Sequence, residues 1–226
     1  MPYDFARLLN IRSATNPILV PEGGRVAFLS DITGNWQVWS VVTHGEGELR
    51  WPRQLSFLPD KVWELHGTPA ARHLLAVSDA AGNERQQFYL ISNYGVEEYK
   101  DEAHDVRRLT RDDNAIHQFG AWSTDGQQIV YTSNARNGVH FDIYRMDVRN
   151  GEAHLLSETG GLRSVAAWSP DGQYVLSTEE VSSVEHDLYL LNVQSGEETK
   201  ITAGKSPARY WSVQWTVGGV YLLSDR

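Results

Sequence analysis

Trp122-Ser-Thr-Asp-Gly126 is followed by the apolar stretch Gln128-Ile-Val-Tyr-Thr-Ser133, and this order of tryptophan, turn and apolar strand returns twice. The later copies are Trp168-Ser-Pro-Asp-Gly172 and Trp215-Thr-Val-Gly-Gly219. The three tryptophans are 46 and 47 residues apart. A period of this size is typical of an array of β-sheet blades, so the repeat predicts a β-propeller.

The unit around Trp122 divides into four strands joined by turns. Thr124-Asp-Gly126 predicts a turn, because glycine tolerates positive φ and aspartate can accept a hydrogen bond from its own backbone. Asn150-Gly151 is a strong hairpin signal before the last strand. The segments between the turns are rich in β-branched and aromatic residues, which favour strands. We expect strands at residues 117–123, 128–133, 142–148 and 153–157.

The next unit has the same order of segments. Pro170 presets the first dihedral angle of its turn, and Ser195-Gly196 predicts the turn before its last strand. Tyr144 and Tyr189 occupy the same place in the two units, 45 residues apart. We expect strands at residues 165–169, 174–178, 187–193 and 199–202, with a loop between the second and the third.

Two earlier units are more diverged, and an insertion at residues 92–105 lengthens the second of them. Their strands are expected at residues 26–31, 37–41, 54–56, 74–79, 87–91 and 108–110. A fifth unit begins at Arg209 and holds two of the expected strands. We therefore interpret residues 1–226 as a single propeller domain or a propeller fragment. Its blades are predicted at residues 14–57, 62–110, 115–157, 162–202 and, incomplete, 207–226.

The predicted fold is all-β, a propeller of four-stranded antiparallel blades with about four and a half blades present, either partial or five-bladed. An unfinished blade exposes an unpaired sheet edge. Either an N-terminal strand at residues 4–11 helps to complete the fifth blade, or the chain is part of a longer polypeptide. We favour the second, because one short strand cannot supply two missing ones. We also expect the uncovered apolar face to cause self-association or irregular closure.

The composition excludes several classes of function. The net charge is −9, and no basic run is longer than Arg107-Arg108, which argues against nucleic acid and anionic membranes as partners. No segment approaches the roughly 18 apolar residues of a membrane helix, and residues 1–10 lack the pattern of a signal peptide. There is no cysteine for disulfide or thiol chemistry. We expect a soluble, cytoplasmic protein.

No catalytic constellation can be assigned from the sequence. A serine hydrolase needs a G-x-S-x-G turn, which this chain lacks. Gly204-Lys-Ser206 lacks the earlier glycine of a phosphate-binding loop, so we expect an inter-blade loop. The eight histidines form no H-x-H or H-E-x-x-H pattern, and we expect His117 and His186 to be ordinary residues at strand starts. We therefore predict no catalytic, cofactor-binding or metal-binding residues, and no cofactor.

Four features allow both a structural and a functional interpretation. Arg111-Asp-Asp-Asn114 is expected to be an exposed turn rather than a calcium site, because the glycine and distal glutamate of a calcium loop are missing. The acidic insertion is either a solvated hairpin tip or an arm that contacts another domain or gates a cavity. Glu179-Glu180 is either an exposed loop pair or a site that receives a peptide's amino terminus. The three repeat tryptophans are expected to pack between blades, since ligand stacking would not need a period.

The repeat units resemble the TolB-type propeller repeat in five segments. These are Phe119-Gly-Ala-Trp-Ser-Thr-Asp-Gly126, Ser133-Asn-Ala-Arg-Asn-Gly138, Phe141-Asp-Ile-Tyr144, Ala167-Trp-Ser-Pro-Asp-Gly172 and Asp187-Leu-Tyr-Leu190. Together with Gly82-Asn-Glu-Arg-Gln-Gln-Phe-Tyr89 and Val106-Arg-Arg-Leu-Thr110, they most resemble the N-terminal propeller of the prolyl oligopeptidase family, in the style of its acylaminoacyl-peptidase-like members. The resemblance covers roughly residues 14–226.

In that family a propeller precedes an α/β-hydrolase domain with a Ser, Asp and His triad, covers its active site and restricts access to short peptides. None of the catalytic positions has a counterpart in this sequence. The resemblance thus implies the non-catalytic, substrate-gating propeller portion of a serine peptidase, truncated before the catalytic domain. Its implied partners are the hydrolase domain in cis and a peptide substrate. Whether the chain itself counts as an enzyme stays open.

Two other functions remain as alternatives. A stand-alone TolB-like propeller would bind protein partners through one face, but TolB-type proteins are exported and the N-terminus shows no export signal. A propeller enzyme with its own site in the central channel is the third alternative, for which the sequence offers no convergent acid–base or metal-binding set.

Overall fold

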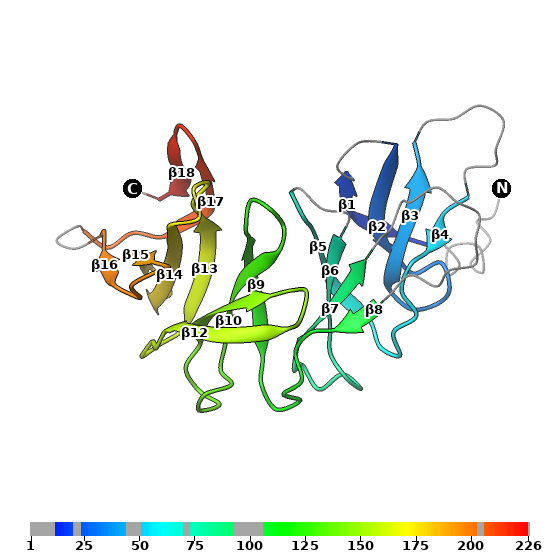
Figure 1. The fold of residues 1–226 in the computed structure, drawn as a ribbon, viewed down its shortest axis with the longest axis horizontal. Helices are drawn as coiled ribbons and strands as arrows, with labels where there is room; N and C mark the ends of the chain where they lie inside the picture. The colour runs from blue at the N-terminus through cyan, green and yellow to red at the C-terminus, as the bar shows by residue number, and fades with distance from the viewer. Residues whose placement is uncertain are drawn as a thin grey trace, which may run out of the picture. The chain divides into compact units, whose positions relative to one another are not determined.

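The computed structural model describes residues 12–19, 24–43, 51–69, 73–92, 106–202 and 206–225. The regular structure of these residues consists of 18 strands (Figure 1). They form four sheets of four antiparallel strands and one hairpin of two strands. The predicted fold class, an all-β propeller built from four-stranded blades, is therefore confirmed. Within the described part of the chain, no helix has the length and hydropathy needed to span a bilayer.

The strands belong to two compact units, of which the first contains two sheets. Its strands are β1 (Ala14–Leu19), β2 (Arg25–Ser30), β3 (Gln37–Val42), β4 (Arg53–Gln54), β5 (Val62–Gly67), β6 (His73–Ser78), β7 (Gln87–Ser92) and β8 (Val106–Arg108). They are paired in chain order within each sheet. Side chains of both sheets, among them Leu29, Val38, Leu65 and Ile91, form one buried apolar cluster. Burial of this cluster is the main source of stability for the unit.

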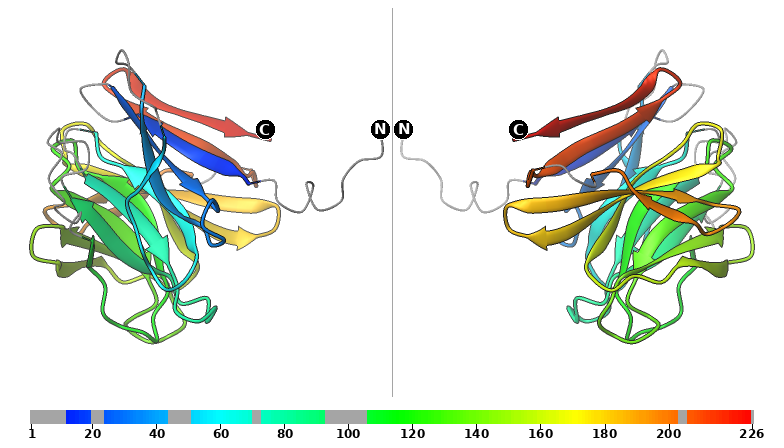
Figure 2. Two further views of the ribbon diagram at one scale, coloured as in Figure 1. Left: turned by 90° about the vertical axis from the view of Figure 1, so that its right-hand side faces the viewer. Right: turned by 90° about the vertical axis from the view of Figure 1, so that its left-hand side faces the viewer.

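The second unit contains two further sheets and the hairpin. Its strands are β9 (His117–Trp122), β10 (Gln128–Ser133), β11 (Asp142–Asp147), β12 (Glu152–Ser157), β13 (Arg163–Trp168), β14 (Tyr174–Ser182), β15 (Glu185–Asn192), β16 (Glu198–Lys200), β17 (Tyr210–Thr216) and β18 (Gly219–Ser224). Figure 2 shows β17 and β18 as the red hairpin. Val130, Ile143, Val175 and Leu191 join the two sheets in a buried cluster.

The repeated turns have the same hydrogen bonds in consecutive sheets. In the first, Gly126 N–H donates to the Ser123 carbonyl at 2.9 Å, and Asp125 accepts from the Gln127 N–H at 3.0 Å. The turn at Ser169–Gln173 repeats both contacts at 2.9 and 3.0 Å. Gly126 and Gly172 have φ values of 68° and 75°, which favour glycine. The predicted turn chemistry is therefore confirmed.

A buried polar side chain recurs in the third strand of each four-stranded sheet. The four residues are Gln37, Gln87, Asp142 and Asp187. Gln37 donates from Nε2 to the carbonyls of Leu58 and Asp60, and Gln87 donates in the same way to carbonyls of the segment that follows its sheet. The two glutamines thus satisfy backbone carbonyls of the connections between sheets, which would otherwise be buried without partners.

Several strand ends differ from the predicted ones. The outermost strands β4, β8 and β16 end two residues before the predicted ends at Ser56, Thr110 and Thr202. For Ser56 and Thr202 the cause is visible, because their hydroxyls accept the N–H groups of Val38 and Leu188 in the third strands. Their side chains have replaced the backbone ladder at these positions.

The predicted loop between the second and third strands of the fourth sheet is wrong. The strand β14 continues through Ser182 and returns as β15 from Glu185, so the two form a long hairpin. Predictions for residues 4–11, for most of the acidic insertion (93–105) and for Gly204 and Lys205 lie outside the described residues. The division of the chain into blades remains a prediction.

Candidate functional site

Two adjoining pockets of about 170 and 340 Å³ lie in the second unit, and Glu180 and His186 line both of them. We call them together the hairpin groove. The smaller pocket is also lined by Gln118, Leu162, Ser164 and Thr178, and the larger one by Ser183, Arg209 and Trp211. The groove thus combines a carboxylate, an imidazole, a guanidinium, an indole, an amide and three hydroxyls.

The long β14–β15 hairpin positions the two shared side chains. Glu180 and His186 are directly opposite each other in the antiparallel register, and Thr178 is opposite Leu188. Because side chains alternate between the two faces of a strand, Thr178 and Glu180 lie on one face, together with His186 across the ladder. Had the hairpin been the predicted loop, this shared face would not exist.

The imidazole of His186 is fixed by the backbone at the start of β17. Its Nδ1 lies 3.3 Å from the carbonyl oxygen and 3.4 Å from the nitrogen of Tyr210. The backbone N–H of His186 donates to the Ala208 carbonyl at 2.9 Å. His186 therefore lies at a strand start and packs there, as predicted, while its ring also forms part of the groove wall.

Arg209 lines the larger pocket and is held by an ion pair with Asp225. Its Nε donates to Asp225 at 2.9 Å, and its backbone N–H donates to the same carboxylate at 2.8 Å. These two hydrogen bonds lower the pKa of Asp225, so the carboxylate stays charged. The Arg209 guanidinium carbon is 5.8 Å from the centre of the Trp211 ring. The indole, 41% exposed, thus presents a surface on which an aromatic or cationic group could stack.

The adjacent glutamates, interpreted from the sequence as either an exposed loop pair or a site for a peptide's amino terminus, lie in β14 and face opposite sides of the sheet. Glu179 contacts the buried guanidinium of Arg163 at 3.5 Å, and Glu198 does so at 3.4 Å. The same guanidinium is 3.8 Å from the centre of the Tyr189 ring. Burial first and then the hydrogen bond to Glu179 raise the pKa of Tyr189. Glu179 is therefore structural, and only Glu180 belongs to the groove.

Arg163 is a buried structural residue that was not predicted from the sequence. Its side chain is 5% exposed and also donates to the Ser177 hydroxyl at 3.1 Å. A signal was present, because Arg163 lies five residues before Trp168, and the buried His117 lies five residues before Trp122. In the third and fourth sheets this position begins the first strand, and its side chain is buried there.

The other sequence candidates have structural roles. Asp112 accepts the N–H of Asn114 at 2.9 Å in an exposed turn, and Arg85 donates to the Asn114 carbonyl at 2.7 Å. The expected exposed turn is therefore confirmed. Among the described residues, no group of three histidine, aspartate or glutamate side chains could hold a metal ion.

The repeat tryptophans are partly buried. Trp168 packs against the cluster that joins the third and fourth sheets, which confirms its predicted role between blades. Trp122 lies against Phe119, with ring centres 6.0 Å apart. The structure shows no ring contact for Trp215 within the part of the chain that it describes.

No protein-family model and no curated protein matches the chain. Solved structures do match. A putative TolB from Agrobacterium tumefaciens is 18% identical, with a TM-score of 0.61 over 95% of this chain and 70% of its own. A prolyl endopeptidase is 16% identical, with a TM-score of 0.63 over 96% of this chain and 33% of its own. The β-propeller domain of the Trilobed protease from Pyrococcus furiosus is 17% identical, with a TM-score of 0.64 over 96% of this chain and 66% of that chain.

These identities establish the fold alone. The structural neighbours include both TolB propellers and propeller domains of prolyl oligopeptidase-type peptidases, so the resemblance stated from the sequence is confirmed at the level of the fold. This chain spans about a third of the prolyl endopeptidase.

Proposed function

We propose that this chain is the substrate-gating propeller portion of a prolyl-oligopeptidase-family serine peptidase. In this proposal it admits short peptides to an α/β-hydrolase domain in cis, in the cytoplasm. The fold shared with the prolyl endopeptidase and the Trilobed protease supports the proposal. A fold does not determine a function, and the residues of the hairpin groove supply the chemistry that bears on it.

The observation that carries the proposal is the chemistry of the hairpin groove. A peptide offers N–H and carbonyl groups along its backbone, which Gln118, Ser164 and Thr178 can bind. Glu180 attracts a cationic group of the peptide, and Trp211 provides a stacking surface. Because Arg209 is paired with Asp225, the uncompensated charge on the groove wall is that of Glu180. The groove therefore suits a short peptide with a positive and an aromatic group.

Peptide binding tests this directly. The tripeptide Lys-Phe-Ala is titrated into the chain by calorimetry, and the same sequence placed in a loop of a folded carrier protein serves as the comparison. We expect the free peptide to bind and the folded carrier not to bind. Glu180→Gln should weaken binding about tenfold, as expected for loss of one charge-assisted contact. Glu197→Gln removes an exposed carboxylate just before β16, outside the groove, and should leave binding unchanged.

A stand-alone TolB-like propeller is the second candidate function, and the match over 70% of the TolB chain favours it. Such a module would bind the folded carrier as well as or better than the free peptide. The gene sequence after the codon for Arg226 also discriminates. A G-x-S-x-G turn followed by Asp and His would support the peptidase, whereas a stop codon or further blades would support the binding module.

Self-association is a further part of the proposal. The β17–β18 hairpin is a sheet of only two strands, and Tyr221 and Leu223 on β18 are exposed. Sedimentation over a range of concentrations should show species larger than a monomer. A compact monomer at high concentration would contradict it.

A further inference from the structure

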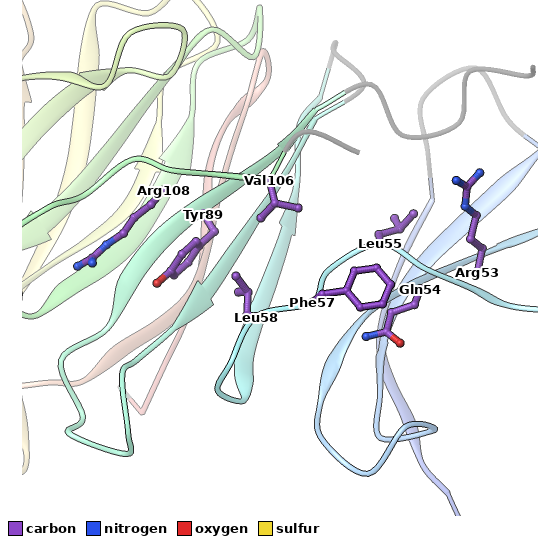
Figure 3. A pocket seen from close by; sticks show the side chains of 8 residues that line it. All are labelled: Arg53, Gln54, Leu55, Phe57, Leu58, Tyr89, Val106 and Arg108. Atoms are coloured by element: carbon purple, nitrogen blue, oxygen red, sulfur yellow. The ribbon is translucent and has the colours of Figure 1, made fainter. Parts of the chain in front are cut away.

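We propose that the first unit contains a second binding site, for a small amphipathic carboxylate, in a pocket between the outer strands of its two sheets. The pocket has a volume of about 550 Å³ (Figure 3), within the range of about 300–1,000 Å³ that holds small ligands. We call it the outer pocket. It shares no residue with the hairpin groove, so it does not depend on the proposed peptide binding.

The floor of the outer pocket is apolar and continuous with the core. Leu55 belongs to the buried cluster of the unit, and Leu58, Tyr89 and Val106 pack against that cluster while remaining partly exposed. Tyr89 is opposite Arg108 in the β7–β8 ladder, and Val106 lies two residues before Arg108, so all three occupy one face. The apolar part of a bound ligand would pack against these side chains and so add to the apolar core of the unit.

Phe57 lines the same pocket and leaves its ring exposed beside the apolar floor. Its side chain is 79% exposed although it follows the buried residues Leu55 and Ser56. In Figure 3 its ring lies between Leu58 on one side and Gln54 on the other. A phenyl ring left in water at the edge of an apolar floor favours an aromatic or branched aliphatic occupant.

The rim supplies the charge that selects a carboxylate. The eight lining residues include two arginines, Arg53 and Arg108, and no acidic residue, in a chain with a net charge of −9. Within the described residues, the guanidinium of Arg53 forms no hydrogen bond or ion pair. An available guanidinium binds a carboxylate through two parallel hydrogen bonds. The guanidinium of Arg53 beside an apolar floor therefore fits a small apolar anion.

The test uses 4-phenylbutyrate as the probe, titrated into the whole chain and followed by NMR at the methyl groups and arginine Nε–H groups. We expect saturable shifts at Leu55, Leu58, Val106 and Arg53. The neutral analogue 4-phenylbutanamide should bind about tenfold more weakly, because it lacks the charge that pairs with arginine.

Two pairs of variants test the assigned contacts. Arg53→Gln should weaken 4-phenylbutyrate binding to the level of the amide, whereas Arg12→Gln, which removes an exposed arginine elsewhere in the unit, should not. Phe57→Ser should weaken binding of both probes, and Trp51→Ser, at a similarly exposed aromatic residue (76%), should not. All four positions are exposed, so the variants are expected to fold.

Three results would overturn the proposal. These are shifts that do not saturate, equal affinity for the acid and the amide, and an Arg53→Gln variant that binds like the unmodified chain. A fourth result would also contradict the proposal, because it would assign a different ligand to the outer pocket. In this result the peptide acetyl-Gly-Gly-Phe, with its free carboxyl end, binds saturably and 4-phenylbutyrate does not.

Discussion

The hydroxyl of Thr202 donates a hydrogen bond to the buried carboxylate of Asp187 at 2.8 Å. The same hydroxyl accepts the backbone N–H of Leu188 at 3.2 Å. In the first sheet of the chain, Ser56 makes the equivalent pair of contacts, to Gln37 at 2.7 Å and from Val38 at 2.8 Å. In both units, a hydroxyl that follows the outer strand forms hydrogen bonds with the third strand. The group that accepts the hydroxyl's hydrogen bond is the Asp187 carboxylate in one sheet and the Gln37 amide in the other.

Replacing Thr202 by valine keeps the volume and removes both hydrogen bonds. The Asp187 carboxylate and the Leu188 N–H are then left without this partner in a buried place. We expect Thr202→Val to lower the free energy of unfolding by about 1–3 kcal/mol, measured by urea titration with circular dichroism. Thr199→Val, at an exposed position of β16, is the matched control and should change it by less than about 0.5 kcal/mol. Equal effects of the two would contradict the role of the hydroxyl.

Arg163 is expected to be far more important for stability than a surface arginine. In Arg163→Met the partly buried carboxylates of Glu179 and Glu198 lose their cation, which should cost about 3–5 kcal/mol in thermal or urea unfolding. The Arg149 side chain is 67% exposed and pairs with Asp147. Arg149→Met removes this ion pair and should lower the free energy of unfolding by less than about 1 kcal/mol. Neutralising both glutamates in the Arg163→Met background should restore part of the loss. The absence of any recovery would show that the cost is packing alone.

Asp142 should make the stability depend on pH in the acid range. Burial raises the pKa of Asp142, but the hydrogen bonds from Arg136 and from the Thr159 N–H outweigh it, so the pKa lies below its usual value. A carboxyl whose pKa is lower in the folded state stabilises the fold above its unfolded pKa of about 3.9, and this contribution is lost as the pH falls through the folded pKa.

Urea unfolding at a series of pH values checks this expectation. Asp142→Asn should be less stable than the unmodified chain near neutral pH, and the difference should shrink as the pH falls below about 4. Parallel stability curves for the two proteins would show that the carboxylate does not titrate with folding.

Gly120 marks a close approach between the third and fourth sheets. A methyl group at this position would meet the side chain of Val165 on β13 and the carbonyl oxygen of Val130 on β10. We expect Gly120→Ala to destabilise the chain by about 1–3 kcal/mol through overpacking, measured by thermal unfolding. Gly160→Ala introduces its methyl group into open space and is the control. A neutral Gly120→Ala would mean that the two strands can separate at little cost.

Much of the fold could be predicted because its signals are local. Gly126 and Gly172 indicate the Asp-Gly turns. Continuous β-branched and aromatic segments such as 128–133 indicate the central strands. Both depend on a few neighbouring residues. The strand ends at Ser56 and Thr202 could not be placed, because there a side chain substitutes for a backbone hydrogen bond that only the assembled sheet defines.

The hairpin groove could not be predicted from the sequence for a similar reason. Glu179 and Glu180 stand out in the sequence as an acidic pair. The alternation of side chains along β14 places them on opposite faces of the sheet. That placement can be predicted only if the strand is known to continue to Ser182. Gln118, Arg209 and Trp211 come from segments far apart in the sequence. Their meeting around His186 depends on how consecutive sheets pack, which no short motif encodes.

The separation of Glu179 from Glu180 has a consequence for engineering. One side of the hairpin carries the ion-pair network that keeps the sheet together, and the other side carries the groove. The residues at positions 180, 183, 209 and 211 therefore form a small set that can be randomised to obtain new recognition properties while the network around Arg163 is left intact. In this hairpin, adjacent residues such as Glu179 and Glu180 can therefore be changed independently of each other.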